Sequence, residues 1–352
     1  MTIKRLIIDQ GSLSEAGSDR GLGRYASALH DAAKALPEVQ TLEYSGSSLS
    51  GKPRHSALRL LDPTRTAWLH ATTPLHLPLV KDRPWICSIQ DVIPLDVRAY
   101  QKLGLRTRAL FLNSRRAERV VVNSTYTADR VRAQLGILAK RLRVLPLPVA
   151  DVFFEAALDE HASNPSTVIV MVDHRTHDPR KRFHWVHQFA EVAKRLGLRV
   201  VVVGRADRTL LPDGVEYIES PSDEKLAELY SGALATFYPS SYEGQGLPPL
   251  EAMAAGCPVI AFANSSVTEM VAVEEFLLLD PLPWVSQRFD EPMPRTTISE
   301  IEAKLRSWAR SAETVRAVRV LARERAESFR RAQFVEALGR IYGEDDGVPT
   351  DQ

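Results

Sequence analysis

The sequence predicts an α/β protein of two doubly wound domains, each a parallel sheet covered on both faces by helices, that face a cleft. The chain has 352 residues, more than the ~250–300 at which a single hydrophobic core stops growing. Apolar, β-branched runs alternate with helical patterns, as buried parallel sheets require. The alternation breaks at residues 151–165, which contain the run DEHASNP. We therefore expect a first domain over 1–150, a linker over 151–165 and a second domain over 166–330.

The elements of the first domain follow in regular order. The run RLIID, residues 5–9, predicts the first strand, a glycine-rich loop follows it, and a helix is expected from about Arg24 to Leu36. Helical patterns predict two more helices near 98–117 and 125–135. The remaining strands are predicted at 41–45, 67–71, 85–92, 119–124 and 141–147.

A second alternation begins after the linker. Residues 299–342 are predicted to be helical and amphipathic, and the polar tail GEDDGVPTDQ is expected to fray. In doubly wound sheets ligands bind at the carboxyl ends of the strands, so we expect a site there, in the cleft between the domains. The strands of this half are predicted at 166–172, 198–204, 214–220, 233–239 and 258–262, and its helices at 181–196, 222–231 and 249–255.

Composition excludes several classes of protein. Hydrophobic residues make up 44% and charged residues 25% of the chain, a balance that excludes disordered chains, collagens and disulfide scaffolds. The two cysteines, Cys87 and Cys257, lie in apolar runs, which favours a reducing compartment. No run reaches the ~20 apolar residues of a membrane span. We therefore expect a cytoplasmic protein without a transmembrane anchor.

The densest motif contains the turn SSYEGQGLPP and the short helix LEAMAAG. Gly244 and Gly246 free the backbone before this helix, so several N–H groups can point at an anion, most usefully a phosphate. Two carboxylates, Glu243 and Glu251, can border the same pocket and accept hydrogen bonds from sugar or ribose hydroxyls. The alternative is that Glu251 only complements the helix dipole from the first turn and that Glu243 is a solvated turn residue.

A second motif is the basic loop HRTHDPRKRF, which follows a predicted strand. Its cations Arg175, Arg180, Lys181 and Arg182 crowd the predicted start of a helix. Cations at a helix N-terminus oppose its dipole, so this placement is destabilising unless an anion is bound. A diphosphate is the obvious anion, with Arg175 as a planar fork and Lys181 as a point charge. The alternative is a solvated basic turn.

A third motif, GSLSEAGSDRGLGRY, follows the first strand. Gly21 and Gly23 precede the helix expected at Arg24 and offer backbone N–H groups from the first domain. A glycine pair is also common in ordinary tight turns. Both readings stay open for this loop.

These motifs resemble those of glycosyltransferase family 4, the retaining enzymes of GT-B fold, which have two Rossmann-like domains. The segment EGQGLPPLEAMAAGCPVIAF resembles the nucleotide-sugar site, with Glu243 and Glu251 as its E-x7-E signature. The loop HRTHDPRK resembles the Arg and Lys pair that holds the donor diphosphate, here Arg175 and Lys181. The stretch DQGSLSEAGSDRGLGRYASAL resembles the N-terminal glycine loop.

The resemblance implies how a nucleoside diphosphate sugar is held. Glu243 would hold hydroxyls of the donor sugar, Glu251 would hold the ribose, and the base would lie near Ile218. A last helix, near 331–343, would pack back on the first domain. The residues expected to act in catalysis are Glu243, Lys181, Arg175 and Gln90, and those expected to bind the donor are Gly21, Gly23, Ile218, Gly244, Gln245, Gly246, Leu247 and Glu251.

Two positions depart from the family pattern. Gln90, in ICSIQDVIPLD, stands where the family often has a histidine near the reacting sugar. A role that needs a titratable imidazole is therefore lost, although an amide can still hold a hydroxyl. His174 stands where a glycine usually precedes the arginine, which would narrow that loop. His70, at the end of a predicted strand, is a candidate on the acceptor side, and a structural role is the alternative.

We expect a retaining glycosyltransferase that moves a hexose, with mannose the first guess, from a GDP- or UDP-linked donor to a hydroxyl of an acceptor such as a lipid-linked or cell-surface glycan precursor. The sequence has no Cys/His ligand set and no Asp-x-Asp pair on a loop, so Arg175, Lys181 and helix dipoles would neutralise the phosphates in place of a metal. Two rivals stay open: a nucleotide-sugar epimerase or hydrolase of the same fold, and a catalytically silent nucleotide-sugar binding protein.

Charge is distributed unevenly along the chain. Residues 1–150 hold 23 Lys+Arg against 12 Asp+Glu, whereas 151–352 hold 22 against 32. No nucleic-acid recognition motif accompanies the basic residues. We therefore expect peripheral contact with an anionic membrane, or with a phosphate-bearing lipid-linked acceptor; the alternative is a solvated helix whose apolar face packs on the first sheet. The basic segment 102–119 contains Lys102, Arg106, Arg108, Arg115, Arg116 and Arg119.

Overall fold

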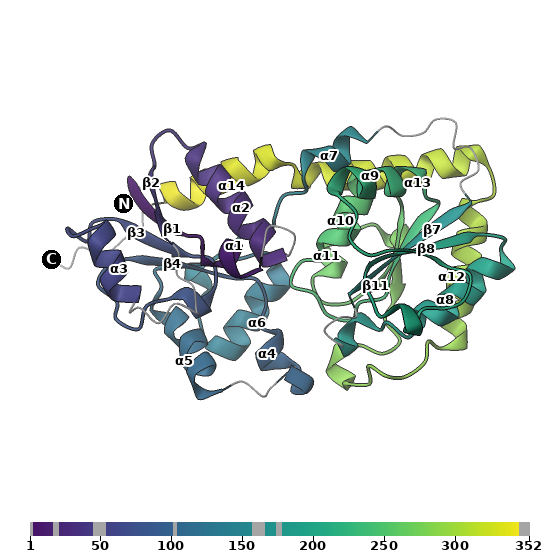
Figure 1. The fold of residues 1–352 in the computed structure, drawn as a ribbon, viewed down its shortest axis with the longest axis horizontal. Coiled ribbons are helices and arrows are strands. Elements are labelled where there is room, and N and C mark those ends of the chain that lie inside the picture. Colours follow the sequence, from purple (N-terminus) through teal and green to yellow (C-terminus); the bar gives the residue numbers. More distant parts are fainter. Residues whose placement is uncertain are drawn as a thin grey trace. The chain divides into compact units, whose positions relative to one another are not determined.

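The chain forms two units, each with one sheet of six parallel strands (Figure 1). The first unit comprises Met1–Pro148 and Arg331–Gln352, and the second comprises Val149–Arg330. Helices cover both faces of each sheet, so the prediction of two doubly wound α/β domains is confirmed. None of the helices in the described part is long and apolar enough to cross a membrane. The computed structural model describes residues 3–16, 21–44, 54–100, 104–156, 166–173 and 178–344.

The first sheet has the strand order β2-β1-β3-β4-β5-β6. The chain moves from β1 to β2 on one side and then to β3 on the other, so the strand order reverses between β1 and β3. Its strands are β1 (Arg5–Asp9), β2 (Gln40–Tyr44), β3 (Trp68–Ala71), β4 (Trp85–Ile89), β5 (Arg119–Val122) and β6 (Leu142–Val144). Its helices are α1 (Gly11–Ala16), α2 (Gly21–Lys34), α3 (Arg54–Leu61), α4 (Ile93–Asp96), α5 (Leu105–Asn113), α6 (Thr125–Leu135) and α14 (Arg331–Gly343).

The second sheet has the strand order β12-β11-β10-β7-β8-β9, with its reversal between β7 and β10. Its strands are β7 (Thr167–Asp173), β8 (Arg199–Arg205), β9 (Glu216–Ile218), β10 (Ala235–Tyr238), β11 (Val259–Ala263) and β12 (Leu277–Leu279). Its helices are α7 (Asp151–Glu155), α8 (Trp185–Arg195), α9 (Asp223–Gly232), α10 (Leu247–Ala254), α11 (Val267–Val271), α12 (Arg295–Trp308) and α13 (Ala312–Ala326).

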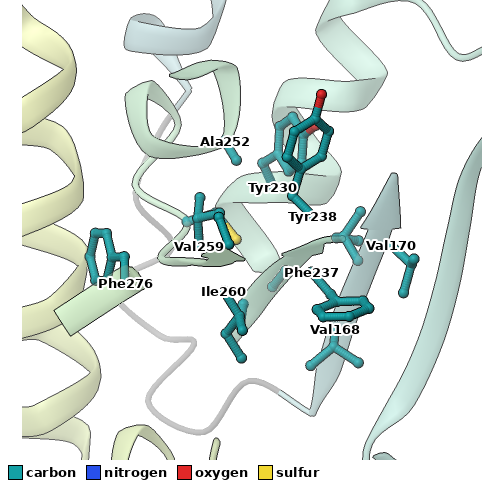
Figure 2. Packing of buried hydrophobic residues seen from close by; sticks show 14 of the residues in the cluster. Val168, Val170, Tyr230, Phe237, Tyr238, Ala252, Val259, Ile260 and Phe276 are labelled. Carbon is teal, nitrogen blue, oxygen red and sulfur yellow. The ribbon is translucent and has the colours of Figure 1, made fainter. Parts of the chain in front are cut away.

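The core of the second unit lies on both faces of its sheet. Successive side chains of a strand point to opposite faces, and Figure 2 shows this for β10, where Phe237 lies beside Val168 and Tyr238 lies beside Tyr230 of α9. Phe237 also stacks on Phe189 of α8, with ring centroids 4.3 Å apart. The alternation therefore places the Tyr238 ring on the opposite face of the sheet from this aromatic stack.

The segment predicted as a linker is partly helical. α7 occupies its first residues, and the side chains of Phe153 and Phe154 are buried. Phe153 packs against Tyr230 of α9, with ring centroids 6.3 Å apart. The burial of these two aromatic side chains stabilises the short helix on the second unit. The polar run that follows α7 led to the prediction of a linker here. Residues 157–165 lie outside the described ranges.

Two helices begin at different residues from those predicted. α2 begins at Gly21 and not at Arg24, because the first N–H groups of a helix need no intrahelical acceptor and glycine is tolerated there. α8 begins at Trp185 and not at 181. Arg182 has a left-handed backbone, with φ of 48°, and this conformation separates the basic turn from the helix. α1, α3 and β12 were not predicted at all.

The basic segment is also less uniform than predicted. α5 is shorter than the helix expected at 98–117, and Lys102 lies outside the described ranges. Arg119 is fully buried, so its inclusion in an exposed basic face is wrong. Glu118 pairs with Lys81 at 2.5 Å. The alternative of an apolar face packed on the sheet holds for Leu110 and Phe111, which are buried.

The C-terminal helix α14 belongs to the first unit, where it lies beside α2 (Figure 1). The hydroxyl of its Tyr342 lies 2.8 Å from Nδ1 of His70, and Nε2 of the same imidazole lies 2.8 Å from Oγ of Ser88. The buried guanidinium of Arg119 donates to carbonyl oxygens at the C-terminal end of α14. His70 therefore holds the helix on the sheet, the structural role that was its alternative.

The His70 imidazole makes stability depend on pH. Burial lowers its pKa from 6.5 to about 3, because the imidazolium is poorly solvated there. Between these values the unfolded chain takes up a proton that the folded chain does not. The contribution of His70 to stability is therefore present above pH 6.5 and is lost as pH falls toward 3.

We predict that His70→Gln lowers the free energy of unfolding at neutral pH and reduces its dependence on pH across this window. Denaturant titrations at a series of pH values measure both quantities. His187→Gln, at an exposed position on α8, is the control. An acid dependence of His70→Gln as steep as that of the wild type would contradict the assignment.

Candidate functional site

The candidate site lies in the second unit, at the carboxyl ends of β7 and β10. These strands are neighbours in the sheet. From β7 the chain continues to β8 and β9 on one side, whereas β10, β11 and β12 lie on the other. The chain therefore continues from β7 and from β10 toward opposite edges of the sheet, and open α/β sheets bind ligands at such reversals of strand order. The loop after β7 is basic, and the loop after β10 contains Glu243.

Glu243 is the most tightly held side chain of this site. It is only 8% exposed, and its Oε1 accepts hydrogen bonds from Lys181 Nζ at 2.5 Å, from the Tyr238 hydroxyl at 2.8 Å and from the Ser240 hydroxyl at 2.5 Å. Burial would raise the pKa of Glu243, but the charges of Lys181 and Arg180 and these hydrogen bonds lower it to about 2. The alternative of a solvated turn residue is therefore wrong.

The second oxygen and the backbone of Glu243 have different surroundings. Oε2 accepts no hydrogen bond from the described residues, and Nη1 of Arg180 lies 3.6 Å from it. The Glu243 N–H donates to Oγ of Ser265 at 3.0 Å, and the Ser266 hydroxyl donates to the Glu243 carbonyl at 2.9 Å. The backbone is thus fixed while Oε2 keeps capacity to accept a hydrogen bond from a ligand.

The basic loop after β7 is compensated by carboxylates of the chain itself. Lys181 pairs with Glu243 at 2.5 Å, and Arg180 pairs with Asp178 at 2.7 Å. Arg182 likewise has a carboxylate partner in this unit. The prediction that these cations are destabilising unless an external anion binds is therefore wrong for Arg180, Lys181 and Arg182, because carboxylates of the chain compensate them. The partner of Lys181, Glu243, is 62 residues away in the sequence. Lys181 Nζ still has two N–H donors without a partner in the described part of the chain.

A buried network joins this loop to the loops after β10, β11 and β12. The fully buried guanidinium of Arg182 donates to Asp280 Oδ1 at 2.8 Å and to the Pro239 carbonyl at 3.4 Å. The Asn264 amide donates to Asp280 Oδ2 at 2.6 Å and to the Ser240 carbonyl at 3.1 Å. These bonds fix the strand end from which Ser240 reaches Glu243.

The helix α10 begins at Leu247, two residues before the predicted start at 249, and Gly246 lies in the left-handed region with φ of 87°. Any other residue would be strained there, so the turn requires glycine. Glu251 is buried, at 4% exposed, and lies beyond the first turn of α10. The suggestion that it only complements the helix dipole from the first turn is therefore wrong. Gln245 and Gly244 are buried as well.

The other predicted residues lie elsewhere. Ile218 is the last residue of β9, the edge strand of the second sheet, and is half-buried. Arg175 and His174 fall outside the described ranges. Gln90 follows β4 of the first unit. Gly21 and Gly23 also belong to the first unit, where they lie in the first turn of α2 and not in a loop, and Gly23 is buried. The donor-binding and catalytic roles of all these residues stay predictions.

Sequence reasoning missed several residues that hold the site together. They lie at the end of an apolar strand of the second sheet, as Tyr238 does, or just after one, in the runs FYPSS, FANSS and LLLDP. Because the carboxyl ends of parallel strands meet at one edge of a sheet, polar residues just after these strands were the available signal. The missed residues are Tyr238, Ser240, Asn264, Ser265, Ser266 and Asp280.

The arrangement suits a ligand that carries both phosphate and hydroxyl groups. Lys181 can donate to phosphate oxygens, and so can the backbone N–H groups of Leu247 and Leu250; Pro248 and Pro249, the other residues in the first turn of α10, have none. With a pKa of about 2, Glu243 is ionised at neutral pH, so it can accept hydrogen bonds but cannot supply a proton. In the described ranges, no three His, Cys, Asp or Glu side chains form a group that could hold a metal ion. Metal independence stays a prediction.

The buried pair of Arg182 and Asp280 gives a prediction about stability. Arg182→Met leaves the Asp280 carboxylate buried without its cation, so the free energy of unfolding should fall by about 3–5 kcal/mol. Arg195→Met, which breaks an exposed pair with Glu302, should cost less than about 1 kcal/mol. Urea unfolding followed by tryptophan fluorescence measures both losses. If Arg182→Met and Arg195→Met lower the free energy of unfolding equally, the Arg182–Asp280 pair does not stabilise the loops.

The candidate site lies within a segment that matches a known protein family. Residues 160–281, which include Lys181, Glu243 and Glu251, match the family model described as glycosyl transferases group 1. The chain is 43% identical over 67 residues to O-antigen chain mannosyltransferase B from Escherichia coli, covering 19% of this chain and 17% of that protein. It is 26% identical over 189 residues to the MMP alpha-(1->4)-mannosyltransferase of Mycolicibacterium hassiacum, covering 51% of this chain and 44% of that protein. The chain thus spans less than half the length of these relatives.

Solved structures extend the likeness to nearly the whole chain. Sucrose-phosphate synthase from Thermosynechococcus elongatus has a TM-score of 0.68 at 18% identity, with 96% of this chain and 98% of that chain covered. Anabaena HepE, solved with UDP and glucose, has a TM-score of 0.64 at 16% identity, with 96% and 99% covered. At these identities the likeness shows the fold alone. The resemblance to glycosyltransferases drawn from the motifs is confirmed: the chain has the GT-B fold, carries a glycosyl transferases group 1 segment and has mannosyltransferase-like relatives.

Proposed function

We propose that the chain is a retaining glycosyltransferase that transfers a hexose, with mannose the first guess, from a GDP- or UDP-linked donor to an acceptor hydroxyl. The observation that carries this proposal is the pair of Lys181 and Glu243 at the carboxyl ends of β7 and β10, within the segment that matches the family model. A cation beside an ionised carboxylate suits a substrate that has a diphosphate at one end and hydroxyl groups at the other.

The donor is proposed to bind through both parts of this pair. Lys181 binds the diphosphate through the two N–H donors that Glu243 leaves available, and Arg175 supplies a second cation. Oε2 of Glu243 accepts a hydroxyl of the donor sugar, Glu251 accepts a ribose hydroxyl, and the base lies near Ile218. The remaining proposed donor contacts are Gly21, Gly23, Gly244, Gln245, Gly246 and Leu247, and Gln90 is proposed to hold a hydroxyl near the reacting sugar.

The proposed reaction exchanges one bond at the anomeric carbon. The bond to the diphosphate oxygen breaks, and its electron pair stays on the diphosphate. The acceptor oxygen bonds to the same face of the sugar, and its proton passes to the leaving diphosphate. Negative charge grows on the leaving group, where Lys181 and the first turn of α10 stabilise it. Glu243 stays ionised, so catalysis rests on positioning and on this charge stabilisation, with no metal expected.

The choice of donor rests on the relatives. Two proteins with matching segments are named mannosyltransferases, which favours mannose, commonly linked to GDP. HepE was solved with UDP and glucose, so a UDP-linked hexose is the second donor to test. The products of GDP-mannose and UDP-glucose, with short mannosides as acceptors, therefore test the proposal.

The two carboxylates should behave differently in this assay. Glu243→Gln should reduce turnover and leave affinity for bare GDP or UDP unchanged or higher, because Lys181 loses its partner. Glu251→Ala should weaken binding of nucleotide and sugar nucleotide alike, by roughly 10- to 100-fold, since a hydrogen bond to a charged group is lost. Calorimetric titration measures the affinities, and Glu228→Gln on exposed α9 surface is the control. Similar nucleotide affinities in the two site variants would contradict these roles.

The product separates the proposal from its rivals. A glycoside that retains the anomeric configuration supports transfer. Free or epimerised sugar would identify a hydrolase or an epimerase of the same fold. Binding of the sugar nucleotide without any product would identify a silent binding protein.

We also propose that the first unit docks on an anionic membrane at the cytoplasmic face, where a lipid-linked glycan precursor is the acceptor. Leu105 of α5 is 88% exposed, and Leu79 is 74% exposed. The Asn113 amide donates to the Pro78 carbonyl at 2.9 Å, which brings this loop against the end of α5. α5 and the turn after it also carry three exposed cations that make no ion pair in the described ranges, Arg106, Arg108 and Arg115.

Removal of these three cations should release the protein from anionic vesicles. Each cation near such a surface contributes about 1 kcal/mol, so the triple Arg→Ser variant should bind roughly a hundredfold more weakly at low salt. Co-sedimentation with vesicles that contain anionic lipid, compared with neutral vesicles, measures this. The control changes three exposed arginines of α12, α13 and the turn between them to Ser: Arg295, Arg310 and Arg316. Binding to anionic vesicles no stronger than to neutral ones would favour a soluble acceptor.

A further inference from the structure

Two amide side chains meet at the carboxyl ends of β4 and β5 in the first unit. The strands are parallel neighbours, with Ile89 paired to Val122, so Gln90 and Asn123 are the next residues on adjacent strands. Nδ2 of Asn123 donates to Oε1 of Gln90 at 3.1 Å. The sequence motifs pointed to Gln90 as a candidate site residue but not to Asn123.

Each amide keeps one polar atom without a partner. Nε2 of Gln90 and Oδ1 of Asn123 are both buried and make no hydrogen bond among the described residues. Asn123 as a whole is only 4% exposed. Buried polar groups are almost always hydrogen-bonded, so two adjacent exceptions require an explanation. A ligand that binds both amides is one such explanation.

The chemistry of that ligand follows from the two atoms. In the structure, Nε2 of Gln90 has no hydrogen-bond acceptor and Oδ1 of Asn123 has no hydrogen-bond donor. If both amides are rotated by half a turn, Gln90 lacks a donor and Asn123 lacks an acceptor, so the pair always offers one of each. A phosphate or carboxylate needs only donors, and an ammonium needs only acceptors. A hydroxyl is both donor and acceptor, so hydroxyl groups suit the pair.

The local backbone holds the pair in place. The Ser124 hydroxyl accepts from the Thr127 N–H at 3.0 Å and caps α6 immediately after Asn123. β4 and β5 are buried along their whole length. A rigid backbone on both sides lowers the cost of ordering these side chains when a ligand binds.

We propose that Gln90 and Asn123 together bind hydroxyl groups of a sugar ring, with Asn123 as a binding residue for the substrate. The inference rests on the proposed glycosyl transfer and deepens it. The sugar belongs either to the donor or to the acceptor, and both present the same chemistry to the pair.

Leucine variants test the pair. Asn123→Leu and Gln90→Leu each replace an amide with an apolar side chain of similar volume. Each should weaken sugar binding by about threefold to tenfold, the effect of losing one neutral hydrogen bond. The double variant should lose little more than either single variant, because the partners act as a unit. Asn113→Leu is the control, since both polar atoms of its amide have partners, the Pro78 carbonyl and Arg116.

Two measurements distinguish the sources of the sugar. Calorimetry compares GDP-mannose with GDP and UDP-glucose with UDP, and ligand-detected NMR measures binding of methyl α-mannoside. A loss for the sugar nucleotides, with the bare nucleotides unchanged, assigns the pair to the donor. A loss for methyl α-mannoside alone assigns it to the acceptor. Melting curves check folding, and Asn123→Asp, which keeps the volume and removes the amide donor, replaces any leucine variant that does not fold.

The outcomes also separate this inference from the proposed function. If the wild-type protein transfers no sugar but the Asn123→Leu variant binds sugar more weakly, the proposed glycosyl transfer is contradicted and sugar binding by Gln90 and Asn123 is supported. If both leucine variants keep the wild-type affinity for every sugar ligand, the inference is overturned, and water is the partner of the two amide atoms. A wild-type protein that binds none of these sugars overturns it equally.

Discussion

The ionised carboxylate of Glu243 is the interaction on which the candidate site depends. A carboxylate at 8% exposure would take up a proton if it were alone. Here Lys181, Tyr238 and Ser240 all donate to one of its oxygens, and Arg180 approaches the other. This arrangement joins the loop after β7 to the loop after β10 across the reversal of strand order. It also decides the chemistry, because a group that stays ionised can accept hydrogen bonds and hold cations but cannot act as a general acid.

Buried polar networks hold the loops of both units. In the second unit, Arg182, Asp280 and Asn264 connect the chain after four strands, β7, β10, β11 and β12, and fix the backbone next to Glu243. In the first unit, His70 and Arg119 hold the end of α14, a helix that returns from the far end of the chain. Such networks contribute little net stability compared with apolar packing, but they penalise every arrangement that leaves a member unpaired. They therefore specify loop positions that an apolar core alone would not.

The two units present different chemistry at the ends of their strands. The second unit offers cations, helix N–H groups and an ionised carboxylate, which suits a charged donor. In the first unit, Gln90 and Asn123 form an uncharged amide pair with a spare donor and a spare acceptor. Neither side chain is titratable, so the hydrogen bonds that this pair can make do not depend on protonation.

The sequence by itself determined the architecture. Continuous apolar runs alternating with amphipathic helices predict parallel sheets, since both faces of each strand must be covered, and every predicted strand is observed within a few residues of its expected position, although β12 was not predicted. The sequence also singled out the loop after β10, in which the structure buries Glu243 and Gln245. The sequence could not show which charges are compensated. Lys181 and Glu243 are 62 residues apart, and Arg182 and Asp280 are 98 apart, so a basic loop that looked uncompensated has its carboxylates supplied by later strands. Likewise Arg119 looked like part of an exposed basic face but is buried against the end of α14. Local periodicity decides which residues form strands and helices, whereas the partners of a charge depend on which strand ends the sheet brings together, and only the tertiary structure decides that.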